Sequence, residues 1–184
     1  MSDTVPDPID AVLRSDHAAI VGQLAELRTV EPAGGAEHFE QLIADIVRHF
    51  VAEEQYLLPT VRERLDGGRR LSDAEFAEHE RIEKLLRRLD DADDVDEQQV
   101  GVTVDALQDA IGEHVRRQEE ELIPQVVAVL DAATLAELGE GALGAEQLAP
   151  THPRAFVPKS RTLSKVTSWL EGLVDKSWDS RGKD

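Results

Sequence analysis

An internal repeat constrains the fold of this 184-residue chain more than any other feature of its sequence. Residues 49–59 align without a gap with residues 114–124, and both segments carry His first, Glu sixth, Leu ninth and Pro eleventh. A weaker match pairs residues 16–20 with residues 78–82. The two matches predict two similar halves, each built from two long segments that carry one histidine apiece.

Apolar residues in all four segments recur at intervals of three and four positions, as on one face of an α-helix. We predict four helices, which begin near residues 7, 36, 72 and 96 and the last of which ends near residue 130. Nothing in the sequence predicts a strand. Four long helices with short connections favour an all-α fold, an up-down-up-down four-helix bundle.

Local signals refine the bounds of these helices. Ser72 with Glu75 three positions later fits a capping box, so the third helix is expected to open at Ser72. Pro59 and Pro124 fall inside the second and fourth helices. Each should kink or interrupt its helix, because proline lacks the amide donor and clashes with the preceding turn.

The chain is expected to divide into three parts. Residues 1–138 would form the bundle with a short trailing helix, residues 139–158 a linker, and residues 159–184 an amphipathic helix and tail. This last helix carries both tryptophans, Trp169 and Trp178, on an apolar face that needs a surface to cover. We expect it to pack on the bundle of its own chain or of a second copy, and docking on another partner is the alternative.

Composition excludes several classes of protein. The 20 Lys and Arg against 38 Asp and Glu give a net charge of −18, which would repel nucleic acid. The absence of cysteine excludes disulfide scaffolds, thiol catalysis and thiolate-held metal clusters. No apolar run is long enough to span a membrane and no secretory signal is visible, so a cytoplasmic protein is expected. Any metal must be held by His and carboxylate side chains.

Four histidines stand at equivalent places, one on each predicted helix: His17, His49, His79 and His114. An isoleucine three positions away from each histidine marks the inward face, so all four should point toward the bundle axis. Glu53 and Glu83 each follow a histidine by four positions and share its face. Glu119 follows its histidine by five, about 140° away on an ideal helix, and needs a local widening such as a π-bulge to point inward.

Most of the other polar residues near this pattern are expected not to bind a metal, and the role of one of them has several alternatives. His38 and His152 show no such pattern and are expected not to be ligands, and Glu54 and Glu120 are expected on a solvated face. Gln118 takes the place that matches Glu53, so no carboxylate is expected there. Tyr56 lies one turn beyond Glu53, where it could pack in the core, donate a hydrogen bond near a metal, or bind the metal.

This constellation resembles the hemerythrin-like, His-His-Glu (HHE) cation-binding family over about residues 8–130. The family pattern places a His on the first helix, His-x-x-x-Glu on the second, His-x-x-x-His on the third and His-x-x-x-x-Asp/Glu on the fourth. The corresponding residues here are His17, His49, Glu53, His79, Glu83, His114 and Glu119. The departure is Glu83, where oxygen-carrying hemerythrins place a fifth His and several bacterial members vary.

The resemblance implies a non-haem di-iron protein whose two irons share oxo or hydroxo and carboxylate bridges. One iron would be held by His79, Glu83 and His114, and the other by His17 and His49. Glu53 and Glu119 would bridge the pair. Val21 stands four positions after His17, as Glu83 does after His79, so the iron held by His17 and His49 would keep an open position for oxygen, peroxide or nitric oxide.

The expected function is therefore the binding or reduction of a small oxidant at iron, with peroxide decomposition as a possible enzymatic activity. Swapping an imidazole for anionic Glu83 should favour ferric iron over reversible oxygen carriage. The alternatives are an iron-sensing, redox-sensing or iron-sequestering module without catalysis, and a metal-free helical adaptor.

Overall fold

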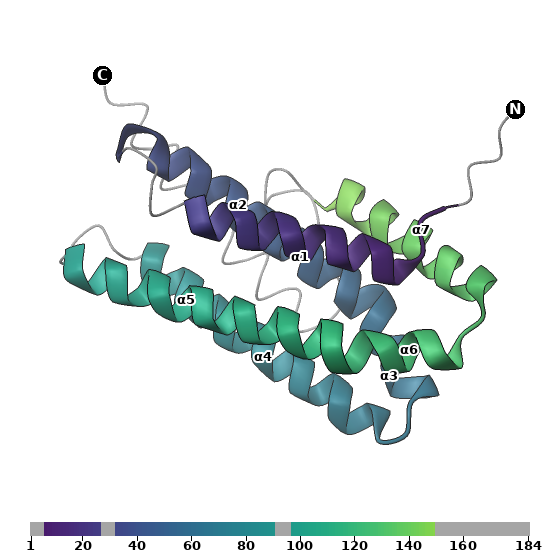
Figure 1. Ribbon diagram of the computed structural model, residues 1–184. Helices are drawn as coiled ribbons and strands as arrows, with labels where there is room; N and C mark the ends of the chain where they lie inside the picture. Colours follow the sequence, from purple (N-terminus) through teal and green to yellow (C-terminus); the bar gives the residue numbers. More distant parts are fainter. Residues whose placement is uncertain (1–5, 27–31, 91–96, 150–184) are drawn as a thin grey trace, which may run out of the picture.

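The computed structural model describes residues 6–26, 32–90 and 97–149 (Figure 1). The predicted C-terminal helix at residues 159–184, with both tryptophans, lies outside this part of the chain, as does His152. Within the described ranges every regular element is helical and no strand occurs, so the all-α prediction is confirmed. No helix in the described part of the chain is both long and apolar enough to cross a membrane.

The elements follow the two halves of the repeat. The first half comprises α1 (Ile9–Glu26), α2 (Pro32–Ala52), the π-helical segment η1 (Glu53–Leu57) and α3 (Leu58–Arg64). The second half comprises α4 (Gly68–Asp90), α5 (Glu97–Arg117), the π-helical segment η3 (Gln118–Leu122) and α6 (Ile123–Val129). One more helix, α7 (Ala132–Leu148), follows and lies against α1 and α2 (Figure 1).

Both prolines interrupt their helices as predicted. Pro59 and Pro124 are each the second residue of a new helical segment, α3 and α6, and a π-helical segment directly precedes each of these. A π-helical turn widens the backbone where the regular α-helical bond to proline cannot form. The sequence pattern led us to expect such a widening only near Glu119, but it occurs in both halves.

The start of α4 differs from the prediction. Gly67 has a φ of 68°, in the left-handed region that favours glycine, and α4 begins directly after it at Gly68. A side chain at Gly68 would collide with the Val61 carbonyl, so glycine permits this tight approach. Ser72 therefore lies inside the helix and is buried, and the predicted capping box is wrong. Glu75 instead accepts hydrogen bonds from α5 and η3.

The chain also stays helical beyond the predicted boundary at residue 138. The Asp131 carboxylate accepts a hydrogen bond of 2.8 Å from the Thr134 amide and so caps the start of α7. The helix then continues through the glycine-rich region to Leu148, where the sequence suggested a linker from residue 139. Gly139 is needed because the helix packs against the backbone of residues 7–9 there.

The apolar core is divided into two clusters that lie on either side of the histidines. One cluster is formed mainly by residues 20–24, 42–51, 82–86 and 107–111. The other is formed mainly by residues 9–13, 57–61, 122–126 and two residues of α7. Along the four bundle helices the histidine lies at or near the boundary between the residues of one cluster and those of the other, so the fold places all four imidazoles in one buried layer.

Candidate metal centre

The four histidines converge, as the sequence pattern predicts. Each is at most 2% exposed, although imidazole is costly to bury without polar partners. The ring centroids of His17 and His49 are 4.7 Å apart, and those of His79 and His114 are 5.4 Å apart. His114 also lies 6.0 Å from His17 and 5.9 Å from His49, so the rings form one compact group.

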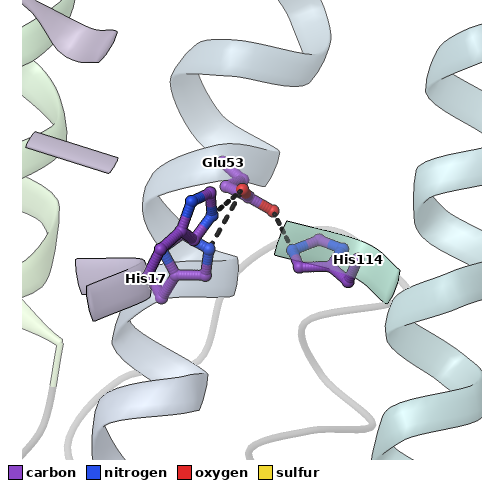
Figure 2. Close-up of side chains that lie close together, drawn as sticks. His17, Glu53 and His114 are labelled. Carbon is purple, nitrogen blue, oxygen red and sulfur yellow. Dashed lines mark ion pairs between the residues drawn. The ribbon is translucent and has the colours of Figure 1, made fainter. Parts of the chain in front are cut away.

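The Glu53 carboxylate lies at the centre of this group and is fully buried. Its Oε1 is 3.1 Å from Nε2 of His49 and 3.9 Å from Nε2 of His17. Its Oε2 is 2.9 Å from Nε2 of His79 and 3.6 Å from Nε2 of His114. Figure 2 shows His17 and His114 on opposite sides of this carboxylate. Glu53 therefore separates the histidines into two pairs, one at each of its oxygens.

The opposite ring nitrogen, Nδ1, of each of these four histidines faces a second carboxylate. The pairs are His17 with Glu119 at 3.0 Å, His49 with Asp16 at 3.4 Å, His79 with Glu54 at 2.9 Å, and His114 with Glu75 at 3.6 Å. A carboxylate beside one ring nitrogen favours a proton there and leaves the other nitrogen as a donor to a metal. All four imidazoles are thus oriented with Nε2 toward the centre.

The unused hydrogen-bonding capacity at the centre fits a metal. Among the described residues, Nε2 of His17, His49 and His114 and Oε1 of Glu53 are buried and form no hydrogen bond of suitable geometry, although His49 Nε2 and Glu53 Oε1 lie 3.1 Å apart. Buried polar atoms normally have a partner, and a bound cation would supply one for all of these atoms together. Within the part of the chain that the structure describes, two groups have donor atoms close enough to hold an ion: His17, His49, Glu53 and His114, and Glu75, His79 and His114.

The charges of the metal-free site are set by Glu53. Burial alone would lower the pKa of His49 and His79, but Glu53, with Asp16 or Glu54, raises the pKa of His49 to about 10 and that of His79 to about 9. Burial holds the pKa of His114 well below its usual value. Burial would raise the pKa of Glu53, yet the adjacent histidines lower it. A metal would therefore have to displace protons from two of the rings.

Glu83 and Glu119 are expected at the centre from the sequence, but neither carboxylate is among the converging donor atoms. Glu83 is buried one turn beyond His79 and belongs to neither group of converging donor atoms. Glu119 is 30% exposed, and its carboxylate contacts the outer nitrogen of His17 and the guanidinium of Arg14, each at 3.0 Å. The widened turn at η3 thus brings Glu119 toward His17 from the outer side of the ring.

The structure adds residues that the sequence reasoning missed. Glu54 is buried beside His79, so its expected place on a solvated face is wrong. The repeat carried a signal for this, because Glu54 aligns with Glu119 and both face an outer nitrogen. Glu75, four residues before His79 and on the same helix face, is also buried. It accepts 3.0 Å hydrogen bonds from Gln118 and Arg117, which explains why Gln118 can be fully buried.

A cavity of about 220 Å³ adjoins the outer side of His49 between α1, α2 and α7. Its lining includes Asp16, Asp45, Arg48 and Glu146. Burial and the nearby Asp16 carboxylate raise the pKa of Glu146 to about 7. The cavity therefore places polar side chains, among them a Glu146 carboxyl with a pKa of about 7, directly beside His49.

Comparison with protein families shows that residues 9–126, more than half of the chain, match the family model of the hemerythrin HHE cation binding domain. The chain belongs to this family. The matched segment includes all four histidines with Glu53, Glu83 and Glu119, and it ends within α6, so α7 follows the hemerythrin domain. No curated protein and no solved structure matches the chain.

Proposed function

We propose that this hemerythrin-domain protein is a non-haem di-iron protein that binds or reduces a small oxidant such as oxygen, hydrogen peroxide or nitric oxide. The observation that supports this most directly is the arrangement of four Nε2 atoms in two pairs around the two oxygens of Glu53. A carboxylate with one pair of imidazoles at each oxygen is suited to bridge two cations. Mixed imidazole and carboxylate donors suit iron.

The proposed ligands follow the two pairs. One iron would be held by His17 and His49, the other by His79 and His114, and Glu53 would bridge them. We include Glu83 as a ligand of the second iron because it is a buried carboxylate on the same helix face as His79. We include Glu119 as the second bridge on the family pattern, which requires its carboxylate to turn away from the outer nitrogen of His17.

The first iron is proposed to bind the oxidant because it has fewer protein ligands. The residue four positions after His17 is Val21, an apolar side chain that is 44% exposed and offers no donor. The same position after His79 holds buried Glu83. The difference leaves the His17 and His49 side with room for an exogenous ligand.

Iron would supply electrons and Lewis acidity at this site. The chain itself buries the site between two apolar clusters, which excludes bulk water from it. A carboxylate at Nδ1 of each imidazole orients the ring so that Nε2 faces the centre. Three carboxylates, Glu53, Glu83 and Glu119, would offset the positive charge of two cations. These features favour a centre that binds small ligands and retains its metal.

Metal content tests the proposal directly. The purified protein should contain about two irons per chain, and H49A and H114A should each lose most of this iron, since each removes a ligand from a different pair. H38A, which changes a histidine of α2 outside the ligand pattern, serves as the control. Full iron content in both ligand variants, with helicity retained, would contradict the assignment.

Turnover separates reactivity from sensing or storage. Reduced protein mixed with hydrogen peroxide should consume it over many cycles when an electron donor is supplied, and azide should change the optical spectrum by binding at the open position. A protein that binds two irons but neither consumes peroxide nor responds to azide would instead be an iron-sensing or iron-sequestering module.

A further inference from the structure

Helix α7 is not part of the repeat and follows the segment that matches the hemerythrin domain. It nevertheless packs along α1 and α2 (Figure 1). It also contacts η1, the π-helical segment that carries Glu53. The added helix therefore contacts the first half of the bundle at the element that presents the central carboxylate.

One close approach of α7 to η1 is between Gly141 and Tyr56. A Cβ atom at Gly141 would lie 2.8 Å from both Cδ1 and Cζ of the Tyr56 ring, so the ring rests directly on the backbone of α7. Carbon atoms do not approach this closely without displacement, and any residue larger than glycine would push the ring away. Gly144, one turn later in α7, has no atom within 4 Å of its Cβ position.

Tyr56 is well placed to transmit this contact to the metal centre. It stands three residues after Glu53 and two after Glu54, inside the same five-residue π-helical segment. Its half-buried side chain packs against both apolar clusters, one on each side of the histidine layer. π-helical turns are rare and occur mostly as single turns inside α-helices, frequently at functional sites. Tyr56 belongs to such a turn, so the seat of its ring bears on the backbone that aims both carboxylates.

A second contact joins α7 to the same half of the site. Glu146 and Asp16 line the same cavity beside His49, and the Asp16 carboxylate faces Nδ1 of His49 at 3.4 Å. Helix α7 thus meets the site at two places, at the segment that carries the bridging carboxylate and beside one of the imidazoles.

We propose that α7 is a positioning element of the metal centre, and that Gly141 is the positioning residue that seats Tyr56 and thereby fixes Glu53 and Glu54. This role rests on the proposed metal site, and it means that α7, a helix outside the family segment, helps to hold the ligands of that site in place. Gly141 touches no ligand, so its effect is indirect.

The test compares G141A with G144A in the full chain. Both changes replace glycine by alanine in the same helix, so their effects on helix propensity match, but only G141A displaces the Tyr56 ring. With cobalt(II) as the probe, G141A should weaken binding by roughly tenfold and shift the visible absorption bands, as changes in outer partners of metal ligands do. G144A should keep the wild-type affinity and bands.

Variants of Tyr56 show whether the ring carries the effect. Y56L removes the ring and should reproduce the loss seen in G141A, whereas Y56F keeps the ring and should stay closer to wild type. In the Y56L background, G141A should cost no more than G144A does, because the clash is already gone. Additive effects of G141A and Y56L would overturn the proposed route, and Y56L gives the answer even if G141A does not fold.

Ring nitrogen chemical shifts in the metal-free protein separate this inference from the proposed function. G141A should move the signals of His49 and His79, which face Glu53 and Glu54, and G144A should not. If wild type binds no cobalt, the di-metal proposal fails while the shifts still test the positioning role. If G141A and G144A are indistinguishable in both measurements, the positioning role is refuted.

Discussion

The two halves of the bundle share a scaffold but not a chemistry. In each half a π-helical segment precedes a proline, and a side chain after the proline donates to the carbonyl four residues earlier: Thr60 to Tyr56 at 2.8 Å and Gln125 to Glu121 at 2.7 Å. The second residue of each π-helical segment contacts Nδ1 of a histidine in the other half: Glu54 contacts His79, and Glu119 contacts His17. The repeat thus builds four equivalent imidazoles.

The carboxylates break this symmetry. The first residue of η1 is Glu53 at the centre of the site, and the matching residue of η3 is Gln118, which turns to Glu75 instead. The α4 side of the site has Glu75 and Glu83 on either side of His79, where the α1 side has Leu13 and Val21 around His17. The duplicated helices therefore supply the common imidazole frame, and single substitutions decide where charge and open space lie.

The largest effect is expected at Glu53, where the halves differ most. E53Q keeps the shape of the side chain but removes the negative charge that faces all four Nε2 atoms. Metal affinity should fall by at least a hundredfold, above the range of roughly 10–100-fold that outer partners of ligands produce. Isothermal titration with cobalt(II) measures this.

The matched control for Glu53 is its counterpart in the second half. Q118L removes the amide that donates to Glu75 without touching an Nε2 atom. Its loss of affinity should stay within the range for outer partners, well below that of E53Q. Equal losses of metal affinity in E53Q and Q118L would mean that Glu53 does not bind the metal directly.

Removing the metal should have the next largest effect, and its size should depend on pH. In the metal-free protein the pKa of His49 is about 10 and that of His79 about 9, because nearby carboxylates outweigh the effect of burial. Raised values stabilise the fold fully below the unfolded pKa of about 6.5, and this contribution is lost as pH rises through 9 to 10. The lowered pKa of His114 acts oppositely, since it reduces stability as pH falls below about 6.5.

We therefore expect the metal-free protein to be most stable near pH 6.5 and to weaken toward alkaline pH. Bound metal needs neutral rings, so the rise in melting temperature that it causes should be larger at pH 8 than at pH 6. Thermal unfolding with and without cobalt(II) across this range tests the trend. A rise that shrinks with increasing pH would show that His49 and His79 do not have to lose protons.

Much of this arrangement can be predicted from the sequence, because it follows from periodicity and repetition. The 3.6-residue pattern predicts the helices, and the isoleucine near each histidine predicts an inward imidazole, which the burial of His17, His49, His79 and His114 confirms. The prolines predict the interruptions before α3 and α6. These are local properties of the chain, and they need no knowledge of which helix lies opposite.

Other features depend on contacts between distant segments and escape such reasoning. The backbone conformation of Gly67 sets the start of α4, so the local capping signal at Ser72 is overridden. The sequence predicts that Glu54 lies on the surface, but the π-helical turn η1 orients its carboxylate toward His79, which is 25 positions away along the chain. The widening that turns Glu119 could be predicted, but not the fact that its carboxylate meets the outer nitrogen of His17.

Glu54 and Glu119 offer the next comparison between the halves, because each contacts the outer nitrogen of one histidine. E54Q and E119Q should each lower cobalt(II) affinity by about 10–100-fold if both carboxylates act only on those nitrogens. If Glu119 also bridges the two metals as proposed, E119Q should lose clearly more metal than E54Q and should alter the spectrum of both ions. Titration followed by absorption distinguishes the two outcomes.

The smallest expected effect concerns the positions four residues after His79 and His17. E83H replaces a buried carboxylate by neutral imidazole, so ferric iron loses an anionic neighbour and the reduction potential should rise while iron stays bound. V21E adds a carboxylate at the matching position of the first half, where the side chain is 44% exposed and a charge would face water. Its potential should therefore remain close to that of wild type, since solvent and salt screen an exposed charge. Spectroelectrochemical titration measures both variants. A rise in E83H without a change in V21E would show that a carboxylate four residues after the histidine acts on the metal only in the second half, whereas unchanged potentials in both would remove Glu83 from the ligand set.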